Sequence, residues 1–177
     1  MFANRILTQA GTRLYEAIVM QARQPVFYQR DGVADDVDGR WDIIVLHACL
    51  VFLRLSGGDR KHTDLAQAVW DAMMLDWDAN LREMGVGDLS VGKRIKVMGR
   101  AAQGRLRAYD EALKGEGDAL TQNLSQALAR NVYRARREPT SALVAYVIQL
   151  RDHLAKQSLA SLMSAKAPFK ELVRRGA

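Results

Sequence analysis

Apolar residues recur at the spacing of an α-helix along almost the whole chain. Leu14, Ile18 and Ala22 form the first stripe, which ends at Gln24-Pro25 because a proline ring disfavours helical backbone in the residue before it. Residues 41–55 are apolar on several faces, and this pattern predicts a central helix that other helices enclose. Strands have little support, because no run of alternating Val, Ile and Thr is bounded by turn residues.

Four later segments show the same helical spacing: residues 64–84, 91–113, 120–132 and 141–165. Asp64 is well placed to cap the first of them. The acid- and glycine-rich residues 29–40 favour a loop. The sequence therefore predicts a single all-α domain of six or seven helices. This domain covers residues 12–165, between an N-terminal segment, 1–11, and a basic C-terminal tail, 166–177.

The connection at residues 81–94, LREMGVGDLSVGKR, is the most specific stretch of the chain. Residues 87–93 match the phosphate-loop pattern G-x-x-x-x-G-K, but Arg94 stands where Ser or Thr should bind magnesium. A helix rather than a strand is predicted before the pattern, and Asp88 would place a negative charge among the phosphate-binding amides. The stretch therefore predicts a turn between two helices, with Asp88 or Ser90 as the cap of the second.

Charge is distributed unevenly along the chain. Residues 1–92 hold nine Lys and Arg against 13 Asp and Glu, whereas residues 93–177 hold 17 against seven, and the net charge is +6. A basic half of this kind favours contact with a nucleic acid, a ribosome, an anionic membrane face or an acidic protein. The same pattern also fits basic helical faces that are simply solvated.

No group of residues in the sequence forms a catalytic or metal site. The three histidines, His47, His62 and His153, lie in different predicted elements and lack the spacing of metal ligands. Cys49 is the only cysteine, which excludes an internal disulfide, and like His47 it is interpreted as a buried core residue. Residues 41–55 are too short and too polar to span a membrane. The sequence predicts a protein that is not an enzyme, with no cofactor, no metal ion and no transmembrane span.

Three segments carry a family resemblance. They are LYEAIVMQARQPVFYQRDGV at residues 14–33, DGRWDIIVLH at residues 38–47 and LREMGVGDLSVGKR at residues 81–94. In this order and spacing they resemble the ubiquinol-cytochrome c chaperone family. The third is the most specific, since an unrelated protein would rarely reproduce so many glycine and charged positions together. The resemblance covers about residues 12–165.

The resemblance implies a non-enzymatic assembly chaperone for the cytochrome bc complex, respiratory complex III, with newly made cytochrome b or its nascent chain as client. It also implies contact with the ribosome near the tunnel exit, and the basic half adds peripheral association with a membrane. Because the chain begins almost directly at the domain, a bacterial member is expected. Its location is then the cytoplasm, at the periphery of the inner membrane, or the matrix side of that membrane in a eukaryote.

Two groups of residues are predicted to bind partners. The first orients the glycine-rich turn or the partner and comprises Arg82, Glu83, Met84, Asp88, Lys93, Arg94, Arg100 and Arg105. The second would form an apolar client groove and comprises Phe27, Tyr28, Trp70 and Trp77, each of which also fits a place in the core. The alternative is a basic helical module that binds RNA or the ribosome without a respiratory client, and such binding should weaken steeply with salt.

Overall fold

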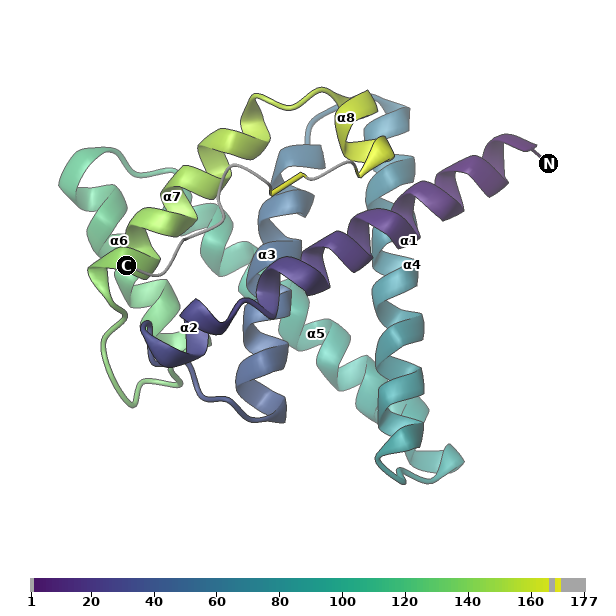
Figure 1. Cartoon of the computed structure of the whole chain (residues 1–177), viewed down its shortest axis with the longest axis horizontal. Helices are drawn as coiled ribbons and strands as arrows, with labels where there is room; N and C mark the ends of the chain where they lie inside the picture. Colours follow the sequence, from purple (N-terminus) through teal and green to yellow (C-terminus); the bar gives the residue numbers. More distant parts are fainter. Residues whose placement is uncertain (1, 166–167, 170–177) are drawn as a thin grey trace.

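The computed structural model describes residues 2–165 and 168–169, and every regular element among them is a helix (Figure 1). In chain order the helices are α1 (Phe2–Ala22), α2 (Pro25–Gln29), α3 (Val37–Leu55), α4 (Arg60–Glu83), α5 (Asp88–Leu113), α6 (Gly117–Asn131), α7 (Ser141–Ala155) and α8 (Leu159–Ser164). Six of them are long, and α2 and α8 are short helices of five and six residues. The prediction of one all-α domain is confirmed. No described helix is both long and apolar enough to cross a membrane.

Helix α3 is the centre of the fold. It packs against α1, α4, α5 and α7, and eleven of its 19 residues are buried. In Figure 1, α1 crosses α3 on one side and α5 crosses it on the other. The prediction of an enclosed central helix is confirmed, because the apolar faces of this segment point to several neighbours at once.

Helix α3 begins four residues earlier than its apolar pattern indicates. The carboxylate of Asp36 caps the helix by accepting a hydrogen bond from the Gly39 amide at 2.7 Å. The preceding chain passes so close that a Cβ on Gly39 would lie 2.0 Å from the carbonyl oxygen of Ala34. Glycine is therefore required at this position, and the predicted loop at residues 29–40 shortens to residues 30–36.

Two other helix starts also differ from the prediction. Asp59, not Asp64, caps α4, with its carboxylate accepting from the Lys61 and His62 amides at 3.0 and 3.3 Å. Helix α5 begins at Asp88 with no side-chain cap, so the predicted capping by Asp88 or Ser90 is wrong. The Asp88 carboxylate instead pairs with Arg82, at the end of the preceding helix.

The glycine-rich stretch is a turn between α4 and α5, which we call the α4–α5 corner (residues 84–89). Gly85, at a φ of +79°, supplies a left-handed conformation that other residues rarely adopt, and it ends α4. Gly92 and Lys93 of the phosphate-loop pattern lie inside α5. A helix precedes the pattern and its second half is itself helical, so the stretch has no phosphate-binding loop.

Helical or buried residues also lie on both sides of residues 12–165. Helix α1 continues through the predicted boundary at residue 11, with Ala10 buried and Gly11 packed tightly against Ala68 of α4. Of the predicted tail, residues 166–167 and 170–177 lie outside the described residues. Phe169 is buried, and the carbonyl oxygen of Pro168 accepts hydrogen bonds from the side chains of His153 and Gln157 at 3.0 and 2.7 Å.

A hydrogen-bonded chain of three side chains crosses the core. His47 Nδ1 lies 2.8 Å from the Ile43 carbonyl oxygen, which can only accept, so this nitrogen carries the proton. His47 Nε2 then accepts from the Tyr146 hydroxyl at 2.7 Å, and that hydroxyl accepts from Gln21 Nε2 at 2.9 Å. Burial lowers the pKa of His47 to about 4. The interpretation of His47 as a satisfied core histidine is confirmed.

Candidate functional site

An open groove of about 830 Å³ lies between the start of α3, the end of α4 and the first half of α5. We call it the corner groove, because the α4–α5 corner borders it. Its apolar lining consists of Val37, Trp41, Leu81, Met84, Val97, Met98 and Ala101. Its polar lining consists of Asp38, Ser90, Lys93, Arg94, Arg105 and Arg134.

Three apolar side chains of the corner groove are strongly exposed. Val37, Met84 and Val97 have 65%, 54% and 52% of their surface accessible to solvent. Apolar side chains gathered in one concave place mark a surface that a partner can cover, because covering them removes apolar area from water. Met84 adds an unbranched, polarizable side chain that can adjust to partners of different shape.

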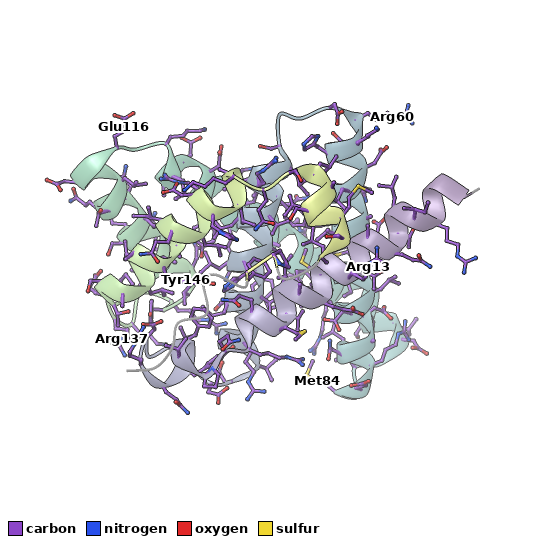
Figure 2. The ribbon with its side chains drawn as sticks, turned by 45° about the horizontal axis from the view of Figure 1, so that its top comes forward. Arg13, Arg60, Met84, Glu116, Arg137 and Tyr146 are labelled. Atoms are coloured by element: carbon purple, nitrogen blue, oxygen red, sulfur yellow. The ribbon has the colours of Figure 1, made fainter. Side chains whose placement is uncertain are left out.

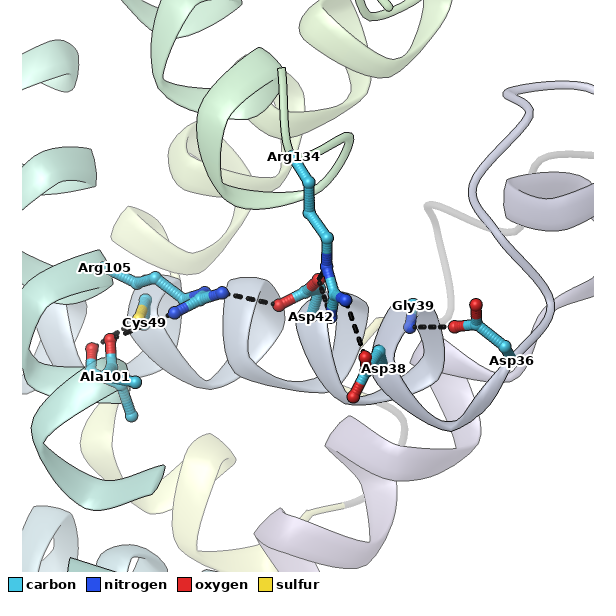
Figure 3. A network of polar contacts seen from close by, with 9 residues as sticks. Asp36, Asp38, Gly39, Asp42, Cys49, Ala101, Arg105 and Arg134 are labelled. Carbon is cyan, nitrogen blue, oxygen red and sulfur yellow. Dashed lines mark hydrogen bonds and ion pairs between the residues drawn. The ribbon is translucent and has the colours of Figure 1, made fainter. Parts of the chain in front are cut away.

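An ion-pair network fixes the floor of the groove (Figure 3). Asp42 of α3 is fully buried, and its two carboxylate oxygens accept from Arg105 Nη2 at 2.8 Å and from Arg134 Nη2 at 3.2 Å. Arg134 Nη1 also donates to Asp38 at 2.6 Å. The network ties α3, α5 and the loop after α6 together beneath the groove.

Burial and neighbouring charges change the pKa values of the two carboxyl groups in this network. Burial raises the pKa of the Asp42 carboxyl, and the guanidinium groups of Arg105 and Arg134 oppose that effect by stabilising the carboxylate. The hydrogen bond from Arg134 lowers the pKa of the exposed Asp38 carboxyl. A buried carboxylate with two hydrogen-bonded guanidinium partners is a structural anchor, because removal of either partner leaves a charge unpaired in the core.

Aromatic packing continues the floor of the groove. The Arg105 guanidinium lies 4.6 Å from the centre of the Trp41 ring, and that ring lies 5.4 Å from the ring of Trp77. Arg134 and Ala135 are two consecutive residues in a left-handed conformation, with φ of 53° and 55°. Such a conformation is costly for residues other than glycine, and here it aims Arg134 at α3.

Lys93 and Arg94 form the basic rim of the groove. Both are exposed, and neither has a carboxylate partner within the part of the chain that the structure describes. Arg82, on the neighbouring end of α4, is different, because Asp78 and Asp88 both pair with it. The free positive charge beside the groove therefore belongs to the first turns of α5.

The structure brings four of the sequence-predicted binding residues into the groove: Met84, Lys93, Arg94 and Arg105. Arg82 and Asp88 pair with each other at the α4–α5 corner. Glu83 and Arg100 are exposed but lie outside the groove lining.

The predicted aromatic groove needs correction, because none of its four residues lines the corner groove. Phe27 is fully buried between His47 and Tyr146, with ring centres 5.4 and 5.2 Å away. Trp77 is also buried, and its ring packs against the ring of Trp41.

The other two aromatic residues are half-buried elsewhere. The Tyr28 hydroxyl donates to the Ala22 carbonyl oxygen at 2.9 Å, and Trp70 packs on Phe52 at 6.0 Å. Both side chains are thus occupied by contacts within the domain.

Val37 and Val97, two exposed apolar residues of the groove, were not predicted to bind a partner, although the sequence contains a signal for them. Val97 lies between the cations Lys96 and Arg100, off the buried stripe of α5, and Val37 lies among acids. An apolar residue at an outward position of an amphipathic helix is such a signal. No signal in the sequence indicated the role of Arg134, because Arg134 and its partner Asp42 lie 92 positions apart.

Comparison with known proteins gives two matches. The family model described as ubiquinol-cytochrome C chaperone matches residues 29–169. The crystal structure of the Cbp3 homolog from Brucella abortus is similar over 92% of this chain and 89% of that chain, with 36% sequence identity and a TM-score of 0.79. No functionally curated protein matches significantly. The matched residues contain the whole corner groove.

Proposed function

The chain belongs to the ubiquinol-cytochrome c chaperone family, and we propose that it assists assembly of the cytochrome bc complex by holding newly made cytochrome b in the corner groove. It does so without catalysing a reaction. The observation that carries this proposal is the cluster of exposed apolar side chains, Val37, Met84 and Val97, in one groove. The proposed place of action is the cytoplasmic side of the membrane into which the client inserts.

The apolar lining suits a segment of a membrane protein. A membrane-spanning helix needs about 20 mostly apolar residues, and outside the bilayer these residues aggregate unless something covers them. The groove covers part of such a segment with the half-buried side chains of Trp41 and Met98 and the exposed side chains of Met84 and Val97. It is open rather than enclosed, so the client can leave when the bilayer offers a better apolar environment.

The basic rim gives the groove a preferred orientation for its client. Lys93 and Arg94 lie beside an apolar floor, and cations stabilise the carbonyl end of a helix or an acidic side chain next to it. A client helix is thus favoured with its C-terminal end, or an acidic flank, toward the first turns of α5. Orientation by two exposed cations adds specificity to apolar contacts that are themselves undirected.

Co-purification from solubilised membranes tests the client. Tagged protein in mild detergent should retain cytochrome b, and the double variant Lys93→Glu with Arg94→Glu should retain clearly less at unchanged helicity. Arg60→Glu with Lys61→Glu is the matched control, because it makes the same charge change at the start of α4, the end away from the α4–α5 corner (Figure 2). Absence of cytochrome b from the native pull-down, or equal loss in both double variants, counts against the proposal.

Deletion of the gene tests the role in the cell. Cells without the protein should lose the cytochrome bc complex while other membrane complexes remain at normal levels. A uniform loss of all membrane complexes would instead indicate a general holding function. An interaction that disappears between low and moderate salt would favour the RNA- or ribosome-binding alternative.

A further inference from the structure

A row of exposed side chains runs along the outer side of α5. Its members are three, four or seven residues apart, which places them on one side of the helix. They are Leu89, Lys93, Lys96, Arg100 and Arg107, and all five are exposed. The row spans about 27 Å at the rise of an α-helix.

The four cations of this α5 row are free of carboxylates. None of them takes part in an ion pair with any residue that the structure describes. From residue 89 to residue 109 the chain contains six Lys and Arg and no Asp or Glu. The positive charge is therefore directed toward solvent along the length of the row, where it can meet an extended anionic surface.

Exposed apolar side chains gather at one end of the row. Leu89 is fully exposed, at 101%, and Met84, which precedes it in the α4–α5 corner, is also more than half exposed. The α4–α5 corner that carries Leu89 and Met84 projects from the body at the lower right of Figure 1. Of the carboxylates nearby, Asp78 and the exposed Asp88 both pair with Arg82, and the exposed Glu83 is the last residue of α4, just before the corner.

We propose that the α5 row docks on a lipid bilayer with anionic headgroups, with Leu89 entering the interface and Lys93, Lys96 and Arg100 lying on the headgroups. The combination of free cations with an uncovered leucine favours lipid over RNA. A nucleic acid backbone would use the cations alone, whereas a bilayer also takes up the apolar side chain. This docking needs no client, so it stands or falls independently of the cytochrome b assignment.

The proposal gives the corner groove an orientation at the membrane. Lys93 belongs to both the row and the groove rim. A protein that rests on its α5 row therefore holds the groove beside the bilayer surface, rather than facing away from it. A membrane client would have a short path from the groove into the lipid.

Sedimentation with large vesicles tests the lipid requirement. The full chain should bind vesicles of phosphatidylcholine with one third phosphatidylglycerol and should stay in solution with phosphatidylcholine alone. The variant Lys96→Gln with Arg100→Gln should weaken partitioning by roughly ten-fold or more, since each near-surface cation contributes several-fold. The control Arg60→Gln with Lys61→Gln should partition like the native chain. Equal binding to both vesicle types, or equal loss in both double variants, overturns the proposal.

A fluorescent label tests the insertion of Leu89. Cys49, the chain's only cysteine, is buried, so Leu89→Cys introduces one accessible thiol for a polarity-sensitive dye. Its emission should shift to the blue on vesicles with phosphatidylglycerol, while the same dye at Arg60→Cys should not respond. An unchanged signal at residue 89, or tighter binding of ribosomal RNA than of these vesicles through the same cations, contradicts docking on lipid.

Discussion

Arg105 lies over the ring of Trp41 at 4.6 Å while its guanidinium donates to the buried carboxylate of Asp42 at 2.8 Å. One side chain thereby joins the apolar floor of the corner groove to the ion-pair network beneath it. The groove keeps its shape because α3 and α5 cannot separate without exposing an unpaired carboxylate in the core. The exposed apolar side chains of the groove are thus held by a rigid ion-pair network.

Removal of the Asp42 carboxylate should destabilise the domain strongly. Asp42→Ala leaves the partly buried Arg105 without its partner, and we expect a loss of about 3 kcal/mol in the free energy of unfolding, measured by urea denaturation. Asp38→Ala removes an exposed partner of Arg134 and should cost less than about 1 kcal/mol. Similar losses in the two variants would show that Asp42 does not anchor the network.

Two glycines should respond in opposite directions to alanine. Gly39→Ala places a Cβ against the Ala34 carbonyl oxygen, so the start of α3 must shift, and a loss of at least about 2 kcal/mol is expected. Gly104→Ala lies in the exposed interior of α5 with open space around it, and should gain about 0.5–1 kcal/mol. Thermal and urea unfolding of both variants measure these changes, and a tolerated alanine at residue 39 would contradict the close approach.

His47 should make the domain less stable in mild acid. Its pKa falls from an ordinary 6.5 to about 4 in the folded chain, so between these values the unfolded chain binds a proton that the folded chain does not. The free energy of unfolding should therefore decrease by roughly 1.4 kcal/mol for each unit by which the pH is lowered across that window, from this residue alone. His47→Gln should be less stable than the native chain at pH 7, and the gap should narrow toward pH 4. Parallel pH profiles would show that His47 does not titrate in this way.

The sequence predicted the fold well where the pattern is local. The apolar spacing within α3 and α5 identifies helices because residues three and four apart share a face. Helix starts were less accurate, because a cap depends on which polar side chain turns back to the backbone. Asp36, Asp59 and Asp64 look equally suitable in the sequence, and only the path of the preceding chain distinguishes them.

The groove was only partly predictable. Lys93 and Arg94 could be found because a dense cluster of glycines and charges marks the α4–α5 corner. The burial of Phe27 and Trp77 could not be predicted. Aromatic residues of these types also occur at binding surfaces, and only the tertiary packing covers these two. Arg134 joined the site through contacts more than 90 residues away along the chain, which no local pattern encodes.

Site-specific photocrosslinking in cells tests the proposed client groove most directly. A photoreactive amino acid at Val97, which lines the groove, should form adducts with newly made cytochrome b. The same group at Leu75, an exposed apolar position of α4 outside the groove, should not. Adducts with cytochrome b at residue 75 but not at residue 97, or at neither position, would show that the corner groove does not hold this client.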